Sequence, residues 1–236
     1  GNYPISMITR KVGPALAAGC TVVLKPAEAT PLCAIEMFKI FEEAGVPNGV
    51  VNLVTASDPK PIGAELTSHP AVRKLTFTGS TAVGKMLAAE AAGRMKRVSM
   101  ELGGHAPFIV CEDADPVHAA KGGSLVKFLN TGQACISPNR FYVHSSNYDA
   151  FLETLTARVA RMKAGSGFEV GVGIGPLVNE AAIEKVDGQV RDAVGKGATA
   201  LAGGAPLTDG AFGKGHFYAP TVLAGVTPDM RIYHEE

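Results

Sequence analysis

The sequence predicts an α/β protein whose first half forms a parallel sheet covered by helices. Short runs of β-branched and apolar residues alternate with longer helical stretches, which is typical of parallel sheets. Apolar residues make up 46% of the 236 residues, enough for a sizeable core. The alternation restarts after Gly103-Gly104, so we expect two domains, 1–103 and 104–236.

The expected helices of the first domain have their own start and stop signals. Thr30-Pro31 opens one helix, with Thr30 as N-cap and Pro31 as first helical residue. Pro14 falls inside another helix, where we expect a kink. Ser80 caps the last one. The expected helices cover 4–18, 30–44, 60–68 and a segment that follows Ser80, and the expected strands cover 21–24, 50–54, 74–78 and 98–102.

The second domain repeats the alternation less regularly. A glycine-rich loop at 165–176 separates its two halves. The expected strands cover 107–110, 140–143, 198–202 and 217–223, and the expected helices cover 116–130, 147–164 and 179–196.

Charge and cysteine content exclude several classes of protein. Lysine plus arginine (22) equals aspartate plus glutamate (22), which argues against nucleic acid or an anionic membrane as partner. No apolar run has the length of a membrane span, and the N-terminus lacks the order of a signal peptide. The four cysteines form no Cys-x-x-Cys pair, which favours free thiols in a reducing, cytoplasmic compartment over disulfides or a metal site.

Cys135 is the candidate nucleophile. The small residues 132–134 give a permissive approach to it, and it follows a helix rather than lying in an apolar stripe. Burial as a structural residue is the commoner fate of a single free thiol. We expect that fate for the three cysteines in apolar surroundings, Cys20, Cys33 and Cys111.

Glu101 is the candidate base. It ends an apolar strand between Met100 and Leu102, and Gly103-Gly104 leaves space beside it for a ligand. Apolar company disfavours the charged form of a carboxylate, which suits a general base. A solvated carboxylate at a strand end is the alternative interpretation.

Two further loops have the features of ligand sites. The turn 79–84 joins a strand to a helix N-terminus, which presents N–H groups to a phosphate, but a capped βα turn explains it equally well. Lys25 and Glu28 follow another strand, where charged residues often line a ligand crevice. A solvated loop is the alternative there.

Six motifs then stand in a fixed order along nearly the whole chain. They are Asn2-Tyr3-Pro4, Lys11-Val12-Gly13-Pro14-Ala15-Leu16-Ala17-Ala18-Gly19, Lys25-Pro26-Ala27-Glu28, Phe77-Thr78-Gly79-Ser80-Thr81, Glu101-Leu102-Gly103-Gly104 and Gly132-Gln133-Ala134-Cys135. In this combination the chain resembles the aldehyde dehydrogenase superfamily, NAD(P)-dependent enzymes that oxidise aldehydes to acids. The stretch Met7-Ile8-Thr9-Arg10-Lys11 is most similar to the succinate-semialdehyde dehydrogenase branch.

The resemblance implies a role for each group near the reaction. Cys135 attacks the aldehyde carbon, and the Asn2 amide holds the developing oxyanion together with the backbone N–H of Cys135. Glu101 activates the water that hydrolyses the resulting thioester. Arg10 matches an arginine that binds a substrate carboxylate, whereas Leu129 stands where the branch usually has a second arginine.

The resemblance also implies a cofactor site in a partial, Rossmann-like domain. Glu28 would accept from a ribose 2′-hydroxyl and repel a 2′-phosphate, so we expect NAD rather than NADP. The positions that match cofactor-binding residues are Lys25, Glu28, Gly49, Gly79, Ser80, Leu102 and Glu236. No metal is expected.

Family members are longer, so the chain is identified as a central fragment with parts of a cofactor domain and of a catalytic domain. We expect it to be inactive alone, and the parent enzyme to be a homo-oligomer, a dimer or tetramer, acting on a small aldehyde. His105 is expected to be a surface or core histidine, and Ser137 replaces a second cysteine of some branch members. The alternatives are a non-catalytic nucleotide- or partner-binding module and a reductase of acyl phosphates. The presence of Cys135, Glu101 and Asn2 together favours the dehydrogenase.

Overall fold

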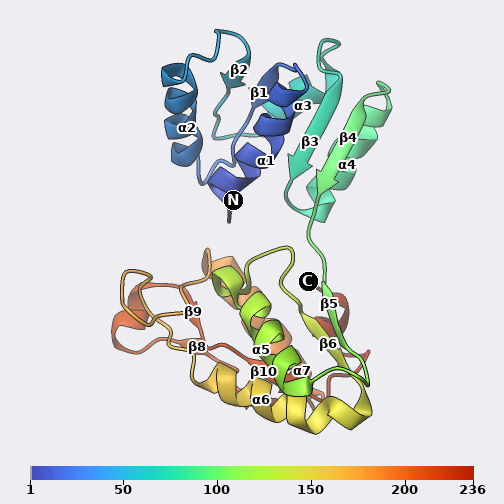
Figure 1. Ribbon diagram of the computed structural model, residues 1–236, viewed down its shortest axis with the longest axis vertical. Helices are drawn as coiled ribbons and strands as arrows, with labels where there is room; N and C mark the ends of the chain where they lie inside the picture. The colour runs from blue at the N-terminus through green and yellow to red at the C-terminus, as the bar shows by residue number, and fades with distance from the viewer. Residues whose placement is uncertain (1) are drawn as a thin grey trace. The chain divides into compact units, whose positions relative to one another are not determined.

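The computed structural model describes residues 2–236 as two compact units. The first unit extends to Gly103 and the second begins at Gly104. Each has its own helices, strands and apolar core (Figure 1). None of the helices in the described part of the chain is long and apolar enough to cross a membrane.

Two pairs of parallel strands form the first unit. β1 (Val22–Leu24) pairs with β2 (Val51–Leu53), and β3 (Lys74–Thr78) pairs with β4 (Arg97–Glu101). All four strands are parallel to their partners, as the alternation of strands and helices predicts. We expected one sheet, but within residues 2–236 the two pairs are separate hydrogen-bonded ladders of three and five residue pairs.

Helices cover these strands and bury two small cores. α1 (Pro4–Ala17) and α2 (Leu32–Glu43) lie with β1 and β2, and α3 (Lys60–Ser68) and α4 (Thr81–Ala92) lie with β3 and β4 (Figure 1). The first core centres on the buried residues Ile8, Val12 and Ala34. The second centres on Leu75, Leu87 and Ala91.

The helix starts agree with the sequence signals only in part. Ser80 caps α4, because its Oγ accepts a hydrogen bond from the Val83 N–H at 3.4 Å. The prediction of Thr30 as the cap of α2 is wrong. Pro31, in helical backbone geometry, occupies that position without a side-chain cap, and the helix begins at Leu32. α1 continues through Pro14 to Ala17, and the Pro14 carbonyl accepts from the Ala18 N–H at 3.0 Å.

The second unit has one parallel and two antiparallel strand pairs. β5 (Pro107–Val110) is parallel to β6 (Arg140–Val143), and its register pairs Phe108 with Phe141. β7 (Thr199–Ala202) is antiparallel to β10 (Val222–Ala224), and β8 (Pro206–Leu207) is antiparallel to β9 (Phe217–Tyr218). The single strand expected at 217–223 is therefore two strands with different partners. Pro220 lies between them, and it has no N–H to donate to a ladder.

The helices of the second unit pack on β5 and β6. α5 (Pro116–Lys127) and α6 (Tyr148–Ala160) lie side by side (Figure 1). They bury a core of Val110, Ala120, Phe151, Leu155, Val159 and Val222. The remaining helices are α7 (Glu180–Gly195), α8 (Arg231–His234) and three 3₁₀ turns, η1 (Leu129–Gly132), η2 (Ser145–Asn147) and η3 (Gly210–Lys214). Both α5 and α6 end earlier than expected, at Lys127 and Ala160.

Asn147 joins the start of α6 to the turn between β5 and α5. Its buried side-chain amide donates to the carbonyls of Cys111, Glu112 and Ala114 at 2.8, 3.0 and 3.2 Å. These carbonyls belong to a turn that has no ladder partner for them. The amide therefore supports the turn that precedes α5, which is itself capped by Asp115, and α5 leads to the loop that carries Cys135.

We expect Asn147→Ala to lower the free energy of unfolding by roughly 1–3 kcal/mol, because three carbonyls of the turn lose a buried donor. Asn147→Asp, which has the same shape but places a carboxylate against carbonyl oxygens, should lose at least as much at neutral pH. Urea unfolding of both variants measures this, with Ser146→Ala at the exposed hydroxyl as control. A change within about 0.5 kcal/mol for Asn147→Ala would show that the amide is dispensable.

Candidate active site

A cavity lies beyond the carboxyl ends of β1 and β2. The ends of neighbouring parallel strands meet at one edge, and the loops that follow them enclose a volume of about 290 Å³. Its lining includes a proline on either side of Glu28 and two hydroxyls from the second loop. The lining residues are Pro26, Ala27, Glu28, Pro31, Thr55, Ala56 and Ser57. The cavity is partly open to solvent, and it lies at the strand ends where ligands bind in open parallel sheets.

Glu28 on this cavity forms an ion pair with Lys25. The Lys25 ammonium donates to Glu28 Oε1 and, at 2.9 Å, to the Pro26 carbonyl. The hydrogen bond from Lys25 holds the pKa of the Glu28 carboxyl below its usual value. Lys25 and Glu28 therefore present a paired charge to a ligand rather than a lone carboxylate.

The ends of β3 and β4 bring four predicted site residues together. The Gly79 N–H donates to the Glu101 carbonyl at 3.1 Å, which continues the ladder one residue beyond Thr78. Ser80 follows as the cap of α4. Leu102 packs on the first turn of α4 so closely that a Cβ at Gly84 would lie 2.5 Å from its Cδ2 atom. The helix N-terminus, with its free N–H groups, therefore stands beside the end of the Glu101 strand.

Glu101 itself is exposed, as a solvated strand-end carboxylate would be, and the apolar surroundings expected from its neighbours are not formed. The structure adds Lys11 to its surroundings, a residue to which we assigned no role. Lys11 donates to Thr76 Oγ1 at 2.9 Å. Partial burial lowers the pKa of Lys11, and the Glu101 charge opposes that shift. Only the position of Lys11 inside the second motif could have indicated it.

The remaining predicted residues of the first unit are spread over three places. Asn2 is exposed immediately before α1, and Arg10 is exposed on α1. Gly49 has a left-handed φ of +85° in the turn before β2, and its carbonyl accepts from the Asn52 amide at 3.0 Å. Such a φ is what glycine permits at little cost.

Cys135 is exposed in the second unit, in a turn that follows η1. The helix expected to reach residue 130 ends at Lys127 because Asn130, Thr131 and Gly132 all have left-handed backbone, with φ of 51, 60 and 78°. Thr131 is β-branched, and this conformation is rare for such a residue. The chain is thereby turned sharply out of α5 just before the thiol.

Hydrogen bonds to a second segment hold this conformation. Thr131 Oγ1 accepts from the Gly175 N–H at 2.9 Å, and Gln133 Oε1 accepts from the Val178 N–H at 2.9 Å. Gln133 Nε2 also donates to the Pro176 carbonyl at 3.4 Å. The end of the glycine-rich loop therefore supports the residues on the N-terminal side of Cys135.

Ser137 and Lys127 support the other side. Ser137 is only 1% exposed, and its hydroxyl donates to the Lys127 carbonyl at 2.8 Å. The Lys127 ammonium donates to Asn139 Oδ1 at 2.7 Å. Burial lowers the pKa of Lys127 from its ordinary 10.5 to about 8. The serine in place of a second cysteine is thus part of the packing beneath the loop.

The other cysteines differ from expectation. All four described cysteines are free thiols, and Cys20 and Cys111 are exposed while Cys33 is half-buried. The prediction that these three are buried structural residues is therefore wrong for Cys20 and Cys111. Apolar neighbours in sequence do not bury these two thiols, because both lie just beyond the end of an element rather than on a packed face.

Glu236 lies in the second unit with Cys135, after α8. The amide of Gln189, only 7% exposed on α7, donates to the Glu235 carbonyl at 3.2 Å and to the Glu236 carbonyl at 3.5 Å. His105 is half-buried, as a core histidine would be, and neither ring nitrogen has a partner among residues 2–236. The same residues contain no cluster of three or more His, Cys, Asp or Glu arranged to hold a metal ion.

The predicted residues therefore form two groups. One lies in the first unit, where Lys25, Glu28, Gly79, Ser80, Glu101 and Leu102 lie at or just beyond the carboxyl ends of β1, β3 and β4, while Asn2, Arg10 and Gly49 lie elsewhere in that unit. The other lies in the second unit, in the Cys135 loop and after α8. The first unit thus offers parallel strand ends beside a cavity, and the second presents an exposed thiol in a loop held by hydrogen bonds.

Comparison with known proteins shows the family to which the chain belongs. The model of the aldehyde dehydrogenase family matches residues 2–236, so the chain belongs to that family, and the resemblance read from the six motifs is confirmed. Succinate-semialdehyde dehydrogenase (NADP(+)) 1 of Schizosaccharomyces pombe is 51% identical over 235 residues, which are all of this chain and 47% of that protein. Glutarate-semialdehyde dehydrogenase of Pseudomonas aeruginosa is 49% identical, over all of this chain and 48% of that protein.

The fold agrees with solved structures. The crystal structure of succinate-semialdehyde dehydrogenase from Burkholderia pseudomallei superimposes with a TM-score of 0.91 at 52% identity, covering 98% of this chain and 47% of that one. This confirms the predicted α/β fold of the aldehyde dehydrogenase type. The chain spans about half the length of the relatives it matches.

The burial of Lys127 gives stability a defined pH dependence. The Lys127 pKa is about 8 in the folded chain and 10.5 when unperturbed. Between these pH values Lys127 is protonated in the unfolded chain but largely neutral in the folded one, so the free energy of unfolding rises with pH across the window. Below about pH 8 the charged, buried ammonium lowers the free energy of unfolding by its full amount. Relative to Lys127→Met, the wild-type free energy of unfolding should therefore rise from about pH 8 to about pH 10.5, by at most about 3 kcal/mol. Urea unfolding across this range measures it, and an unchanging difference would contradict the burial of a titrating ammonium.

Proposed function

We propose that the protein containing this chain oxidises an aldehyde to the carboxylic acid with a nicotinamide cofactor, through a covalent bond to Cys135. The observation that carries this proposal is the exposed Cys135 thiol, held on both sides by hydrogen bonds in a member of the aldehyde dehydrogenase family. A structural thiol would have no need of exposure together with such support.

The chain's own residues account for binding and proton movements. The Cys135 thiolate adds to the aldehyde carbon, and the former carbonyl oxygen becomes an oxyanion that the Asn2 amide and the Cys135 N–H stabilise. A nicotinamide cofactor supplies, when bound, the acceptor for the hydride that leaves this carbon. Glu101 then takes a proton from water, whose oxygen attacks the thioester, so that the acid leaves and Cys135 is regenerated as thiolate.

The cofactor fits the first unit best, so we propose residues 1–103 as a partial cofactor domain and 104–236 as a partial catalytic domain. The cavity beside Glu28 lies at the strand ends where such a cofactor would place its adenosine, and the α4 N-terminus at Gly79-Ser80 suits a pyrophosphate. Leu102 follows β4 at this edge, whereas Gly49 precedes β2 and is assigned to the cofactor only by its match to the family. Glu236 is assigned to the nicotinamide ribose by its place in the family's motif.

The choice between NAD and NADP depends on Glu28. A carboxylate at the ribose favours NAD, and NAD stays our expectation from that residue. The name of the fission yeast relative specifies NADP(+), which does not support this preference. The Lys25 partner explains how Glu28 could tolerate a phosphate, because its ammonium is already at the same place.

For the substrate we propose a semialdehyde, a small molecule with an aldehyde at one end and a carboxylate at the other. Relatives named for succinate and for glutarate semialdehyde are similarly close to this chain. Arg10 is exposed and available to a carboxylate, whereas Leu129 offers none of the charge of a second arginine. Within this proposal the enzyme is a cytoplasmic homo-oligomer, and the present chain alone turns over little substrate.

Variants of Cys135 and Glu101 should stop the reaction at different steps. In the full-length protein, Cys135→Ala should abolish aldehyde-dependent NAD(P)H formation, whereas Glu101→Gln should give a burst of about one NAD(P)H per site followed by slow release of acid. Stopped-flow absorbance measures both, and Cys111→Ala is the control at another exposed thiol. Rapid steady turnover of the Glu101 variant would show that another base serves, and binding of nucleotide without any oxidation would favour the non-catalytic module.

Glu28→Gln tests the origin of cofactor choice. Removing the carboxylate also frees Lys25 for a 2′-phosphate, so the ratio of kcat/KM for NADP over NAD should rise by roughly tenfold or more. Glu36→Gln is the matched control, because Glu36 pairs with Lys39 at the same sequence spacing on an exposed face. Steady-state kinetics with a semialdehyde give the ratio. An unchanged ratio would mean that Glu28 does not read the ribose.

A further inference from the structure

The last residue of α5, Lys127, is a partly buried cation whose burial does not stabilise the fold. Its ammonium donates to a neutral amide oxygen, Asn139 Oδ1, at 2.7 Å. No carboxylate forms an ion pair with it among residues 2–236, and desolvation is the cause of its lowered pKa. A desolvated cation without a counter-ion is unfavourable for folding, so its presence calls for another reason.

Lys127 lies beneath both sides of the Cys135 loop, through its backbone carbonyl as well as its side chain. On the N-terminal side, a Cβ at Gly132 would lie 3.3 Å from the Lys127 carbonyl oxygen and 3.7 Å from its Nζ atom. On the C-terminal side, the Ser137 hydroxyl donates to the same carbonyl at 2.8 Å. Asn139, which accepts from the ammonium, is itself held by its N–H to the His105 carbonyl at 3.2 Å.

We propose that Lys127 is a positioning residue for Cys135, which fixes the loop 132–139 from beneath and supplies the positive charge that favours the thiolate. The proposal rests on the function above, in which Cys135 is the nucleophile. A cation behind a cysteine loop stabilises the thiolate relative to the thiol. Gly132 is needed in this arrangement for space as well as for its φ, since a side chain there would meet the lysine.

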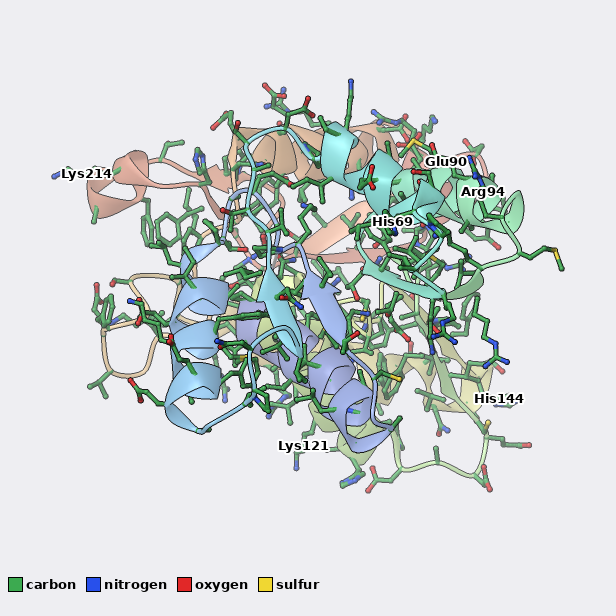
Figure 2. All side chains as sticks on the ribbon, turned by 90° about the horizontal axis from the view of Figure 1, so that it is seen from above. His69, Glu90, Arg94, Lys121, His144 and Lys214 are labelled. Carbon is green, nitrogen blue, oxygen red and sulfur yellow. The ribbon has the colours of Figure 1, made fainter. Side chains whose placement is uncertain are left out.

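The charge and the support are separable by mutation. Lys127→Met keeps the length of the stem but removes the cation, whereas Lys127→Arg keeps the cation. Asn139→Ala keeps the lysine and removes its acceptor, so the variant remains informative if Lys127→Met does not fold. Lys121→Met is the matched control, because Lys121 lies on the same helix with an exposed side chain, at the lower edge of Figure 2.

The test is the pH profile of alkylation at each cysteine of the full-length protein, using iodoacetamide and peptide mass spectrometry. We expect Lys127→Met to move the midpoint of Cys135 alkylation upward by about one pH unit, Asn139→Ala to move it in the same direction by less, and Lys127→Arg and Lys121→Met to leave it within a few tenths. The exposed thiols of Cys20 and Cys111 serve as internal references and should not move.

The proposal is overturned if Cys135 in Lys127→Met and Asn139→Ala keeps the wild-type midpoint, or if Cys111 moves as much as Cys135, which would indicate general loosening. Alkylation needs no aldehyde turnover. A wild-type protein that oxidises no aldehyde would refute the proposed function, while the Cys135 midpoints would still decide whether Lys127 controls the thiol.

Discussion

The Cys135 loop depends on an unfavourable left-handed backbone conformation that neighbouring segments stabilise. Asn130 and Thr131 are both left-handed, a state that costs on the order of 1–3 kcal/mol for each such residue. The chain leaves α5 in this way because side chains of the loop form hydrogen bonds that stabilise the turn. Thr131 bonds to Gly175, and Ser137 bonds back to the Lys127 carbonyl. Strain before the thiol is thus balanced by hydrogen bonds on either side of it, and a loop over-determined in this manner holds one conformation.

The first unit uses a different device, the shared edge of parallel strands. β3 and β4 are in register to their ends, where Thr78 pairs with Glu101, and the Gly79 N–H adds one further bond. Because α4 begins only two residues after Gly79, its first turn needs an N-cap at once, and Ser80 is that cap. The same geometry places the strand end that carries Glu101 next to the N-terminus of α4. In the first unit the strand register positions the predicted site residues, whereas in the second unit strained backbone positions Cys135.

The sequence predicted the elements better than their ends or their partners. Alternation located every helix of twelve residues or more, because packing against a sheet requires an apolar face that the sequence displays. It misjudged the end of α5, because a β-branched residue such as Thr131 rarely adopts left-handed backbone. It misjudged Cys20 and Cys111 because burial depends on the fold rather than on neighbours in sequence. Lys11 and Lys127 escaped notice for the same reason. Their importance lies in contacts with residues 65 and 12 positions away.

Glu28 illustrates how a contact changes the meaning of a residue. Read as an isolated carboxylate, it excludes a 2′-phosphate by repulsion. In the structure its charge is matched by Lys25, whose side chain is 20% exposed against 37% for Glu28. The net field of such a pair at a ribose is small, so repulsion of a phosphate is weakened, and rotation of Glu28 away would leave an ammonium in place to bind one. If the cofactor binds here as proposed, the pair of charges, rather than the acidic residue alone, would decide between NAD and NADP. A family member with glutamate here can be close in sequence to relatives named for NADP(+) without contradiction.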